Sequence, residues 1–366
     1  MQRSNRLLPG KHPSTGDYSR SSSLYIMLFV LMLISIFGLT GCDNSSGEVK
    51  SFTGSTMGTT YSIKYVQKKS FKSTDNIKKT VDAELERINS MMSTWDPESN
   101  LSRINKSPAD QWLDLPPDLS KLIGFAFDLS LKTNGKYDVS CGPLVNLWGF
   151  GPKGDKKIPT ESQIKKALQI SGYDKIDLDI KANQLKKKFK ESYIDLSSIA
   201  KGYGVDKVAD TLENFGIKNY MVEIGGEIKT SGKKNDVPWR IAIESPRKEK
   251  NKSFNKVLNF TDCAMATSGD YRNFFKDDKR RYSHTIDPAT GRPVQNDLAS
   301  VSVAIPNGKC FKADAWATAL MASGRENGVE LAVKFKIPAH FIYIEGGKLK
   351  ETSTKLFTTL FTKEVL

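Results

Sequence analysis

The chain has 366 residues, enough for one large domain or two average ones, and its 38% hydrophobic content is ample for a buried core. Its formal net charge is +14, and many lysines lie in short runs such as 186–188. These runs show no interleaved aromatic pattern and no nucleic-acid motif. We therefore expect a solvated basic surface and no nucleic-acid partner, with an anionic membrane surface as the alternative.

The N-terminus is expected to be a targeting segment rather than part of the fold. Four basic residues precede an apolar run over residues 24–39, which is short for a membrane span. The segment Leu39-Thr40-Gly41-Cys42 then resembles a bacterial lipoprotein signal. We expect residues 1–41 to be a signal peptide and residues 42–53 a tether with lipidated Cys42, an uncleaved anchor being the alternative. Asp43 resembles an inner-membrane retention signal, which predicts the periplasmic face of that membrane.

Three cysteines remain after Cys42: Cys141, Cys263 and Cys310. Their odd number and the lack of a CxxC pair argue against a disulfide framework or a zinc site. Buried free thiols are expected, although one disulfide stays an alternative.

The globular domain is expected over residues 54–366. Apolar residues alternate in predicted strands and recur every three to four positions in predicted helices. In chain order we expect a strand at 59–66, helices at 74–92 and 119–131, a helix from the capping box Thr160–Gln163 to Gly172, strands at 176–180, 184–189 and 192–196, a helix at 199–215, strands at 221–224, 227–230, 239–244, 256–260 and 299–305, helices at 311–322 and 324–334, and a strand at 340–344. Without a repeating βαβ rhythm, this order predicts one α+β domain.

Residues 194–204 are predicted to run from a strand into a helix. Ser197 and Ser198 would lie at the helix start, where free backbone N–H groups favour anions. Asp195 could hold a ligand hydroxyl or amine, and Lys201, one turn into the helix, could reach a phosphate. An ordinary helix start is the alternative.

Several other segments could form either turns or binding sites. Gly225-Gly226 permits a tight turn or close approach to a ligand, and residues 266–271 offer hydroxyls and a glycine. Trp95 could stack on a planar ring or lie in the core. Asp138, in a predicted strand before a helix that opens near Pro143, could hydrogen-bond a nucleotide.

His284 is one of three histidines and lies in an alternating segment that ends at Asp287-Pro288. Asp314 and Thr318 are four residues apart on a predicted helix, so they share a face and suit a hard cation such as Mg²⁺. A histidine beside such a site indicates phosphate-ester or pyrophosphate chemistry. A surface or core histidine and a solvated acid are the alternatives.

Taken together, eight segments in chain order resemble the FAD:protein FMN transferase (ApbE) family. They are Thr56–Tyr61, Met92–Trp95 with Leu101–Asn105, Tyr137–Ser140 with Gly142–Leu144, Ile194–Gly202, Glu223–Glu227, Thr267–Tyr271, His284–Gly291 and Asp314–Thr318.

The resemblance implies a single mixed α/β catalytic domain with a flavin site. The residues it places against FAD are Met57, Trp95, Asp138, Val139, Ser140, Asp195, Lys201, Thr267, Ser268 and Ile286. It implies Mg²⁺ held by Asp314 and Thr318, with Ser198 and Ala317 contributing backbone oxygens. Two positions depart from the family pattern: Trp95 stands where many members carry Tyr, and Lys201 stands where some carry Glu.

The implied reaction is Mg²⁺-dependent transfer of FMN from FAD to a Thr or Ser hydroxyl of a partner protein, with release of AMP and with His284 as the general base. The implied acceptors are subunits of the Na⁺-translocating NADH:quinone reductase or of Rnf-type complexes. Two alternatives are hydrolysis of FAD to FMN and AMP, and a flavin-binding lipoprotein without turnover.

Overall fold

The computed structural model describes residues 47–67, 73–152, 154–249, 252–269, 274–277 and 280–361. They belong to one compact unit that extends from Gly47. The expected signal peptide, Cys42 and Asp43 lie outside the described residues. None of the described helices is long and apolar enough to cross a membrane.

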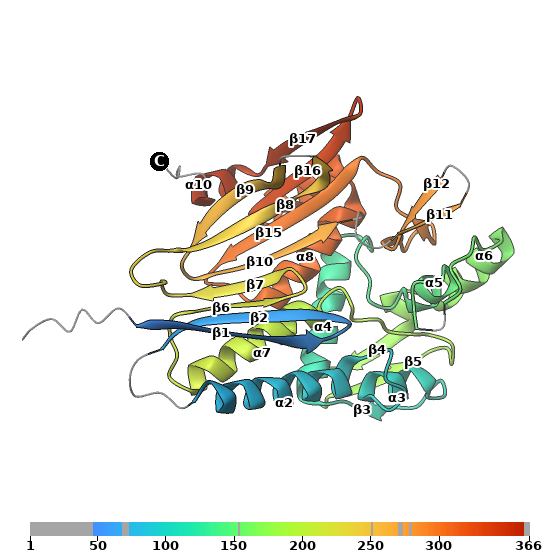
Figure 1. The fold of residues 1–366 in the computed structure, drawn as a ribbon. Helices are drawn as coiled ribbons and strands as arrows, with labels where there is room; N and C mark the ends of the chain where they lie inside the picture. The colour runs from blue at the N-terminus through green and yellow to red at the C-terminus, as the bar shows by residue number, and fades with distance from the viewer. Residues whose placement is uncertain are drawn as a thin grey trace, which may run out of the picture. The chain divides into compact units, whose positions relative to one another are not determined.

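An eight-stranded antiparallel sheet forms the centre of the fold (Figure 1). Its order is β1 (Glu48–Thr56), β2 (Thr59–Gln67), β6 (Tyr220–Ile224), β7 (Glu227–Ser231), β10 (Cys263–Gly269), β15 (Leu298–Pro306), β16 (Ala339–Glu345) and β17 (Lys348–Ser353).

The two faces of this sheet are covered differently, because successive side chains of a strand point to opposite faces. Val301 and Val303 of β15 pack with the apolar residues of α8 (Cys310–Ser323). Ala304, the residue after Val303, points to the other face and packs with Ile241 and Phe357. Helices therefore cover one face, and a strand pair with a short helix covers the other.

The helical face carries α2 (Thr74–Met92), α7 (Ala200–Asn214), α8 and α9 (Arg325–Lys334). The opposite face carries the pair β8 (Trp239–Glu249) and β9 (Lys252–Phe260), with α10 (Lys355–Phe361). The other elements are α3 (Asn100–Lys106), α4 (Pro117–Lys132), α5 (Gly142–Leu147), α6 (Glu161–Ile170), η1 (Tyr173–Lys175), β3 (Leu113–Asp114), β4 (Ile176–Asp179), β5 (Gln184–Lys187), β11 (Phe274–Asp277), β12 (Arg280–Ser283), β13 (Ile286–Asp287) and β14 (Arg292–Pro293).

Strong periodicity predicted several elements well. Helix α2 has the expected bounds and buries Ile77, Val81 and Leu85. The capping box of α6 is present, but that helix ends at Ile170, before Gly172. The α+β class is confirmed.

The compact unit begins earlier than the predicted domain start at residue 54. Strand β1 begins at Glu48 and pairs along its whole length with β2. Phe52 is its buried side chain near the predicted boundary, and the small polar residues around it made the segment similar to a tether. The last part of the expected tether, from residue 48 on, is therefore an edge strand.

Two further expectations need correction. Residues 266–269, expected as part of a turn, belong to β10, a central strand whose small side chains carry little strand signal. Residues 192–196, expected as a strand, form only an isolated bridge between Tyr193 and Cys141. Cys141, Cys263 and Cys310 are free thiols in the described part of the chain, and the latter two are buried.

Candidate active site

The centre of the site is the point where the first turns of α7 and α8 meet. Asp314 of α8 is buried, and its Oδ2 accepts a hydrogen bond of 2.9 Å from the backbone amide of Gly202 in α7. The same first turn of α7 carries Lys201, whose Nζ lies 4.0 Å from Asp314 Oδ1. The two residues expected to meet a cation and a phosphate are therefore brought together.

A second carboxylate completes this cluster. Glu227, the first residue of β7, is buried, and its Oε1 lies 3.4 Å from Lys201 Nζ. Although burial acts to lower it, Asp314 and Glu227 raise the pKa of Lys201 above its ordinary value. Burial acts to raise the pKa of Glu227, and the adjacent Lys201 ammonium acts to lower it. The ammonium is thus held charged between two carboxylates.

Two hairpin turns border the cluster. Gly225 and Gly226 form the turn between β6 and β7, both with positive φ. The turn between β1 and β2 carries Met57 at φ 49°, a left-handed conformation that is uncommon for a residue with a side chain. A Cβ on Gly225 would lie 2.8 Å from Thr59 Cγ2 and 3.3 Å from Lys201 Cδ. The tip of the first hairpin therefore reaches the cluster.

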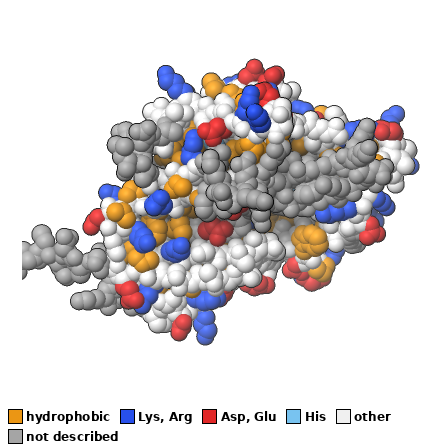
Figure 2. All heavy atoms as spheres, turned by 45° about the horizontal axis from the view of Figure 1, so that its top comes forward, with side chains coloured by type: hydrophobic (Ala, Val, Ile, Leu, Met, Phe, Trp, Pro, Cys, Tyr) orange, Lys and Arg blue, Asp and Glu red, His pale blue; other side chains and the backbone are white. Residues whose placement is uncertain are grey.

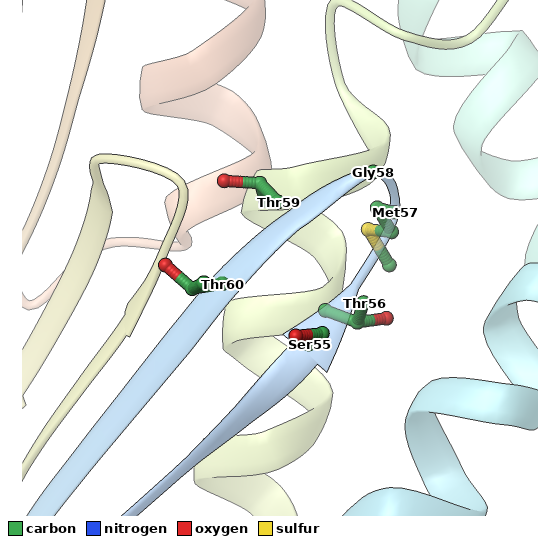
Figure 3. A pocket seen from close by; sticks show the side chains of 6 residues that line it. All are labelled: Ser55, Thr56, Met57, Gly58, Thr59 and Thr60. Carbon is green, nitrogen blue, oxygen red and sulfur yellow. The ribbon is translucent and has the colours of Figure 1, made fainter.

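Met57 is held at this tip by packing on α7. A Cβ on Gly204 would lie 2.9 Å from Met57 Cε, so the absence of a side chain there makes room for the methionine. Residues Ser55 to Thr60 line an open hollow, and Figure 3 shows the Met57 side chain on the opposite side of the hairpin from the hydroxyls of Thr59 and Thr60.

Ser198 is held by Tyr137. The Ser198 hydroxyl donates to Tyr137 Oη at 3.0 Å. Burial raises the pKa of Tyr137, and the nearby charge of Asp314 raises it further.

The carboxylate of Asp138 accepts more hydrogen bonds from the protein itself than we expected of a ligand-binding group. It is buried, and it accepts hydrogen bonds from the Ser140 amide at 2.8 Å, the Ser140 hydroxyl and the Tyr173 amide at 2.8 Å. Burial raises its pKa. Residues 137–140 are not a strand, and these bonds hold their loop in place.

Asp195 lies beside this loop. Its backbone amide donates to the Val139 carbonyl at 2.7 Å, and its half-buried carboxylate accepts from the Ser197 amide at 2.8 Å. The side chain of Asn105 holds Ile194, the residue before Asp195, by two hydrogen bonds. It donates to Ile194 O at 2.9 Å and accepts from Ile194 N at 2.8 Å. These bonds take the place of the strand expected at 192–196.

Thr267 and Ser268 follow one another on β10, so their side chains point to opposite faces of the sheet. The Thr267 hydroxyl lies 2.8 Å from that of Ser302. Strand β7 pairs with β10 only at residues 263–265, so the following residues present their backbone edge beyond the end of β7. A ligand can meet both residues at this edge rather than at one face.

His284 lies between β12 and β13, in a break in the strand expected over residues 282–286. It is half-buried, and its ring centroid lies 6.4 Å from that of Phe150. Ile286 is buried with Tyr282 in a separate apolar cluster, so its side chain is a core contact. The carboxylate of Asp287 pairs with Lys136 at 2.9 Å.

Trp95 is not a core residue. Its relative exposure is 69%, a high value for the largest apolar side chain, and it lies in a bend two residues after Ser93, the C-cap residue of α2. The exposed indole is available to stack on a planar ring.

The cation site fits an ion that prefers oxygen ligands. Thr318 lies one turn after Asp314 on α8 and is half-buried, while Ala317 is buried. In the described ranges, no three His, Cys, Asp or Glu side chains form a group that could hold a metal. Glu227 Oε2 is buried and has no hydrogen-bond partner among the described residues. Glu227 can therefore keep its ion pair with Lys201 when a cation binds to Asp314.

Our sequence analysis assigned no role to Tyr137, Asn105 or Glu227. All three lie within the segments that resemble the family. The hydrogen-bond partner of Tyr137 is 61 positions away in the chain, and that of Asn105 is 89 positions away. Only the adjacent Gly225-Gly226 turn signalled that Glu227 would be held near a ligand.

Comparison with known proteins identifies the class of protein to which this fold belongs. The family model described as the ApbE family matches residues 57–341, which is well over half of the chain. The chain belongs to the ApbE family.

Its relatives match over nearly their whole lengths. The FAD:protein FMN transferase of Vibrio cholerae is 42% identical over 337 residues, covering 92% of this chain and 99% of that protein. The Haemophilus influenzae protein of the same name is 38% identical over 342 residues, covering 92% and 98%.

Solved structures agree with the sequence comparison. The flavin transferase ApbE from Vibrio cholerae has a TM-score of 0.79 at 41% identity, covering 86% of this chain and 99% of that one. The apo form of Pseudomonas stutzeri flavinyl transferase ApbE has a TM-score of 0.80 at 39% identity, covering 87% and 98%. The single-domain fold of ApbE type is thus confirmed.

Proposed function

We propose that this protein transfers FMN from FAD to a Thr or Ser hydroxyl of partner membrane redox proteins, with Mg²⁺ as cofactor and AMP as the second product. Membership of the ApbE family supports flavin transfer. The observation that carries the finer proposal is the contact of Lys201 with Asp314, which lies one turn before Thr318 on α8.

In this proposal Asp314, Thr318 and the backbone oxygens of Ser198 and Ala317 would hold the Mg²⁺. When bound, the ion would neutralise pyrophosphate charge and polarise the attacked phosphorus. Lys201, kept charged by Glu227, contributes a second positive charge near the phosphates.

The reaction exchanges one phosphorus–oxygen bond for another. The acceptor hydroxyl oxygen bonds to the phosphorus of the FMN half, and the bond from that phosphorus to the bridging oxygen breaks, so AMP leaves with the bridging oxygen. His284 accepts the hydroxyl proton on an unprotonated imidazole nitrogen and then releases it to solvent.

The remaining predicted residues would bind FAD. The exposed Trp95 is suited to stacking on a ring, and Met57 reaches the site from its hairpin. Backbone and side-chain groups around Val139, Asp195 and Ser268 would supply hydrogen bonds. The Ile286 side chain is occupied by the core, so contact at this position would come from its backbone.

We further propose that Cys42 is lipidated, that Asp43 retains the protein on the periplasmic face of the inner membrane, and that acceptors are subunits of the Na⁺-translocating NADH:quinone reductase or of Rnf-type complexes. The lipoprotein-like segment at residues 39–42 supports this. On the face drawn in Figure 2, Lys and Arg side chains are spread among other residues, in keeping with a solvated basic surface.

The proposal is tested by incubating the protein with FAD, Mg²⁺ and an acceptor that carries the target Thr. After denaturing electrophoresis, flavin fluorescence should stay with the acceptor and should disappear when a chelator removes Mg²⁺. Free FMN alone would indicate the hydrolase, and unchanged FAD would indicate a flavin carrier.

A further inference from the structure

Helices α7 and α8 each supply a carboxylate to the first turn of the other. Asp314 of α8 accepts the 2.9 Å hydrogen bond from the Gly202 amide in α7. Asp206 of α7 accepts a 3.0 Å hydrogen bond from the Phe311 amide in α8. The N-cap residue of neither helix makes a side-chain cap of its own. Each helix therefore depends on its neighbour to satisfy an N-terminal amide.

The two helices also touch at their backbones. A Cβ on Gly202 would lie 2.6 Å from the Cys310 carbonyl oxygen and 2.7 Å from Phe311 Cα. Such close approach permits only glycine at this crossing. The reciprocal hydrogen bonds thus lie on either side of a backbone contact, and together they determine how far α8 can slide or rotate along α7.

Strand β7 helps to orient both carboxylates, those of Asp314 and Asp206, through the side chains of two lysines. Glu227 and Lys229 are two residues apart on this strand, so they share a face. Glu227 holds Lys201 beside Asp314, and Lys229 Nζ lies 3.2 Å from Asp206 Oδ1. Both members of the second pair are largely buried. With Oδ1 turned toward Lys229, Asp206 keeps Oδ2 for the Phe311 amide.

We propose that Asp206 is a positioning residue for the cation site. By holding the first turn of α8 against α7, it sets the place of Asp314 one turn later, so that Oδ2 meets the Gly202 amide and Oδ1 faces the cation. The inference rests on the proposed function, since it takes Asp314 as a ligand of Mg²⁺.

The test measures binding of Mn²⁺, used as a paramagnetic probe of the Mg²⁺ site, to the full-length protein in the presence of FAD. The electron paramagnetic resonance signal of the free ion reports the dissociation constant. We expect Asp206→Ala to weaken binding about 10–100-fold, the usual effect of removing a residue that orients a metal ligand. Turnover at saturating cation should return to near the wild-type value, because the ligands themselves remain.

Asp210→Asn is the matched control. Asp210 lies one turn further along α7 and pairs with Lys309, the N-cap residue of α8, at 3.4 Å on the surface. Its loss removes an ion pair between the same helices but no amide cap, so the dissociation constant should change less than about twofold. Asp206→Asn keeps an oxygen that can accept from Phe311 and should lose less affinity than Asp206→Ala.

Asp314→Ala separates failure of this inference from failure of the proposed function. If Asp314→Ala loses Mn²⁺ and both Asp206 variants bind like wild type, the positioning role is wrong and the metal site stands. If Asp314→Ala binds like wild type, the metal site is wrong and the positioning role falls with it. If Asp206→Ala does not fold, Asp206→Asn decides: the inference requires weaker binding than in Asp210→Asn.

Discussion

At the scale of single residues, the surroundings of Lys201 explain how a lysine can stand where some family members carry Glu. Its ammonium has two buried carboxylates within 4.0 Å, so its charge is retained despite burial. The Lys201 side chain can therefore stay near Asp314 without a bound cation and move toward Glu227 when a cation binds to Asp314.

His284→Ala should slow turnover about 10²–10⁴-fold, the usual contribution of a general base, while the affinity for FAD changes by only a small factor. Initial rates of acceptor flavinylation and equilibrium binding of FAD measure the two effects. A collapse of affinity with an unchanged rate would instead make His284 a binding residue.

Asp314→Ala should raise the Mg²⁺ concentration needed for half-maximal activity steeply, because it removes the strongest anionic ligand of the proposed site. Asp314→Asn keeps the shape and tests the charge alone. Thr318→Ala should be milder, since water can replace a hydroxyl. Mg²⁺ titrations of activity compare the three, and wild-type activity of Asp314→Ala at low Mg²⁺ would refute the assignment.

The residues proposed to meet the substrate carry clearer local signals than the residues that hold them in place. Asp314, Thr318 and Lys201 belong to short segments with chemical meaning, and Lys201 lies 4.0 Å from Asp314. Asp206 and Asn105 act through backbone groups 105 and 89 positions away. No local pattern in the chain reports such partners.

At the scale of elements, the segment before α7 is held by side-chain clamps rather than by a sheet. Lys187, buried in β5, donates to the carbonyls of Asn105 and Lys190 at 2.8 Å each, and Asn105 in turn holds Ile194. Alternating apolar residues predicted a strand here, but the backbone of this segment bonds to the Asn105 side chain of α3 and to the Val139 carbonyl instead of to a neighbouring strand.

Asn105→Ala should lower the free energy of unfolding by about 2–4 kcal/mol, because it leaves two backbone groups of Ile194 unpaired in the interior. Urea unfolding followed by circular dichroism measures the loss. Asn89→Ala, which removes a single 3.3 Å hydrogen bond to Thr56, is the control. Equal losses in the free energy of unfolding would mean that the two hydrogen bonds of Asn105 contribute no more than the single hydrogen bond of Asn89.

The docking of α10 on the sheet should depend on pH through His340. Its ring stacks on Phe357 of α10 at 5.5 Å and is almost fully buried, with Nδ1 2.7 Å from Ser353 Oγ. Burial, aided by Lys256 and opposed by Glu351, lowers its pKa to about 4. The unfolded chain therefore binds the proton more tightly, and stability falls as pH drops from about 6.5 toward about 4.

Between about pH 7.5 and about pH 5, this histidine should cost about 2 kcal/mol of stability, since one pKa unit corresponds to about 1.4 kcal/mol. Urea unfolding at both pH values measures the difference, and His340→Gln, which does not titrate in this range, should flatten it. An unchanged pH dependence in that variant would show that other groups are responsible.

Periodicity sufficed for elements with one clear apolar face, such as α2, and failed for strands made of small or polar residues. Strand β10 is central, yet Ala264, Ala266 and Ser268 alternate with little contrast in size. Strand β1 lies at the sheet edge and buries only Phe52 and Thr56. Both are defined by pairing with partners distant in the chain, which a local pattern does not contain.

At the scale of the whole molecule, the proposed function requires that the α+β domain be attached to a lipid anchor at Cys42. Cys42→Ala should abolish incorporation of labelled fatty acid and release the protein from membranes, because acyl chains on the first mature residue supply the attachment. Metabolic labelling and fractionation measure this. Recovery of the lipidated protein in the outer membrane would refute the role of Asp43 but not lipidation.

The central claim is that this site moves FMN onto a protein hydroxyl. Its most direct test is the intact mass of an acceptor protein after incubation with the full-length enzyme, FAD and Mg²⁺, with AMP quantified in the same reaction. The account predicts that the acceptor gains the mass of FMN less one water, with one AMP released per modified acceptor. Release of AMP without a gain in acceptor mass, or recovery of all FAD unchanged, would contradict it.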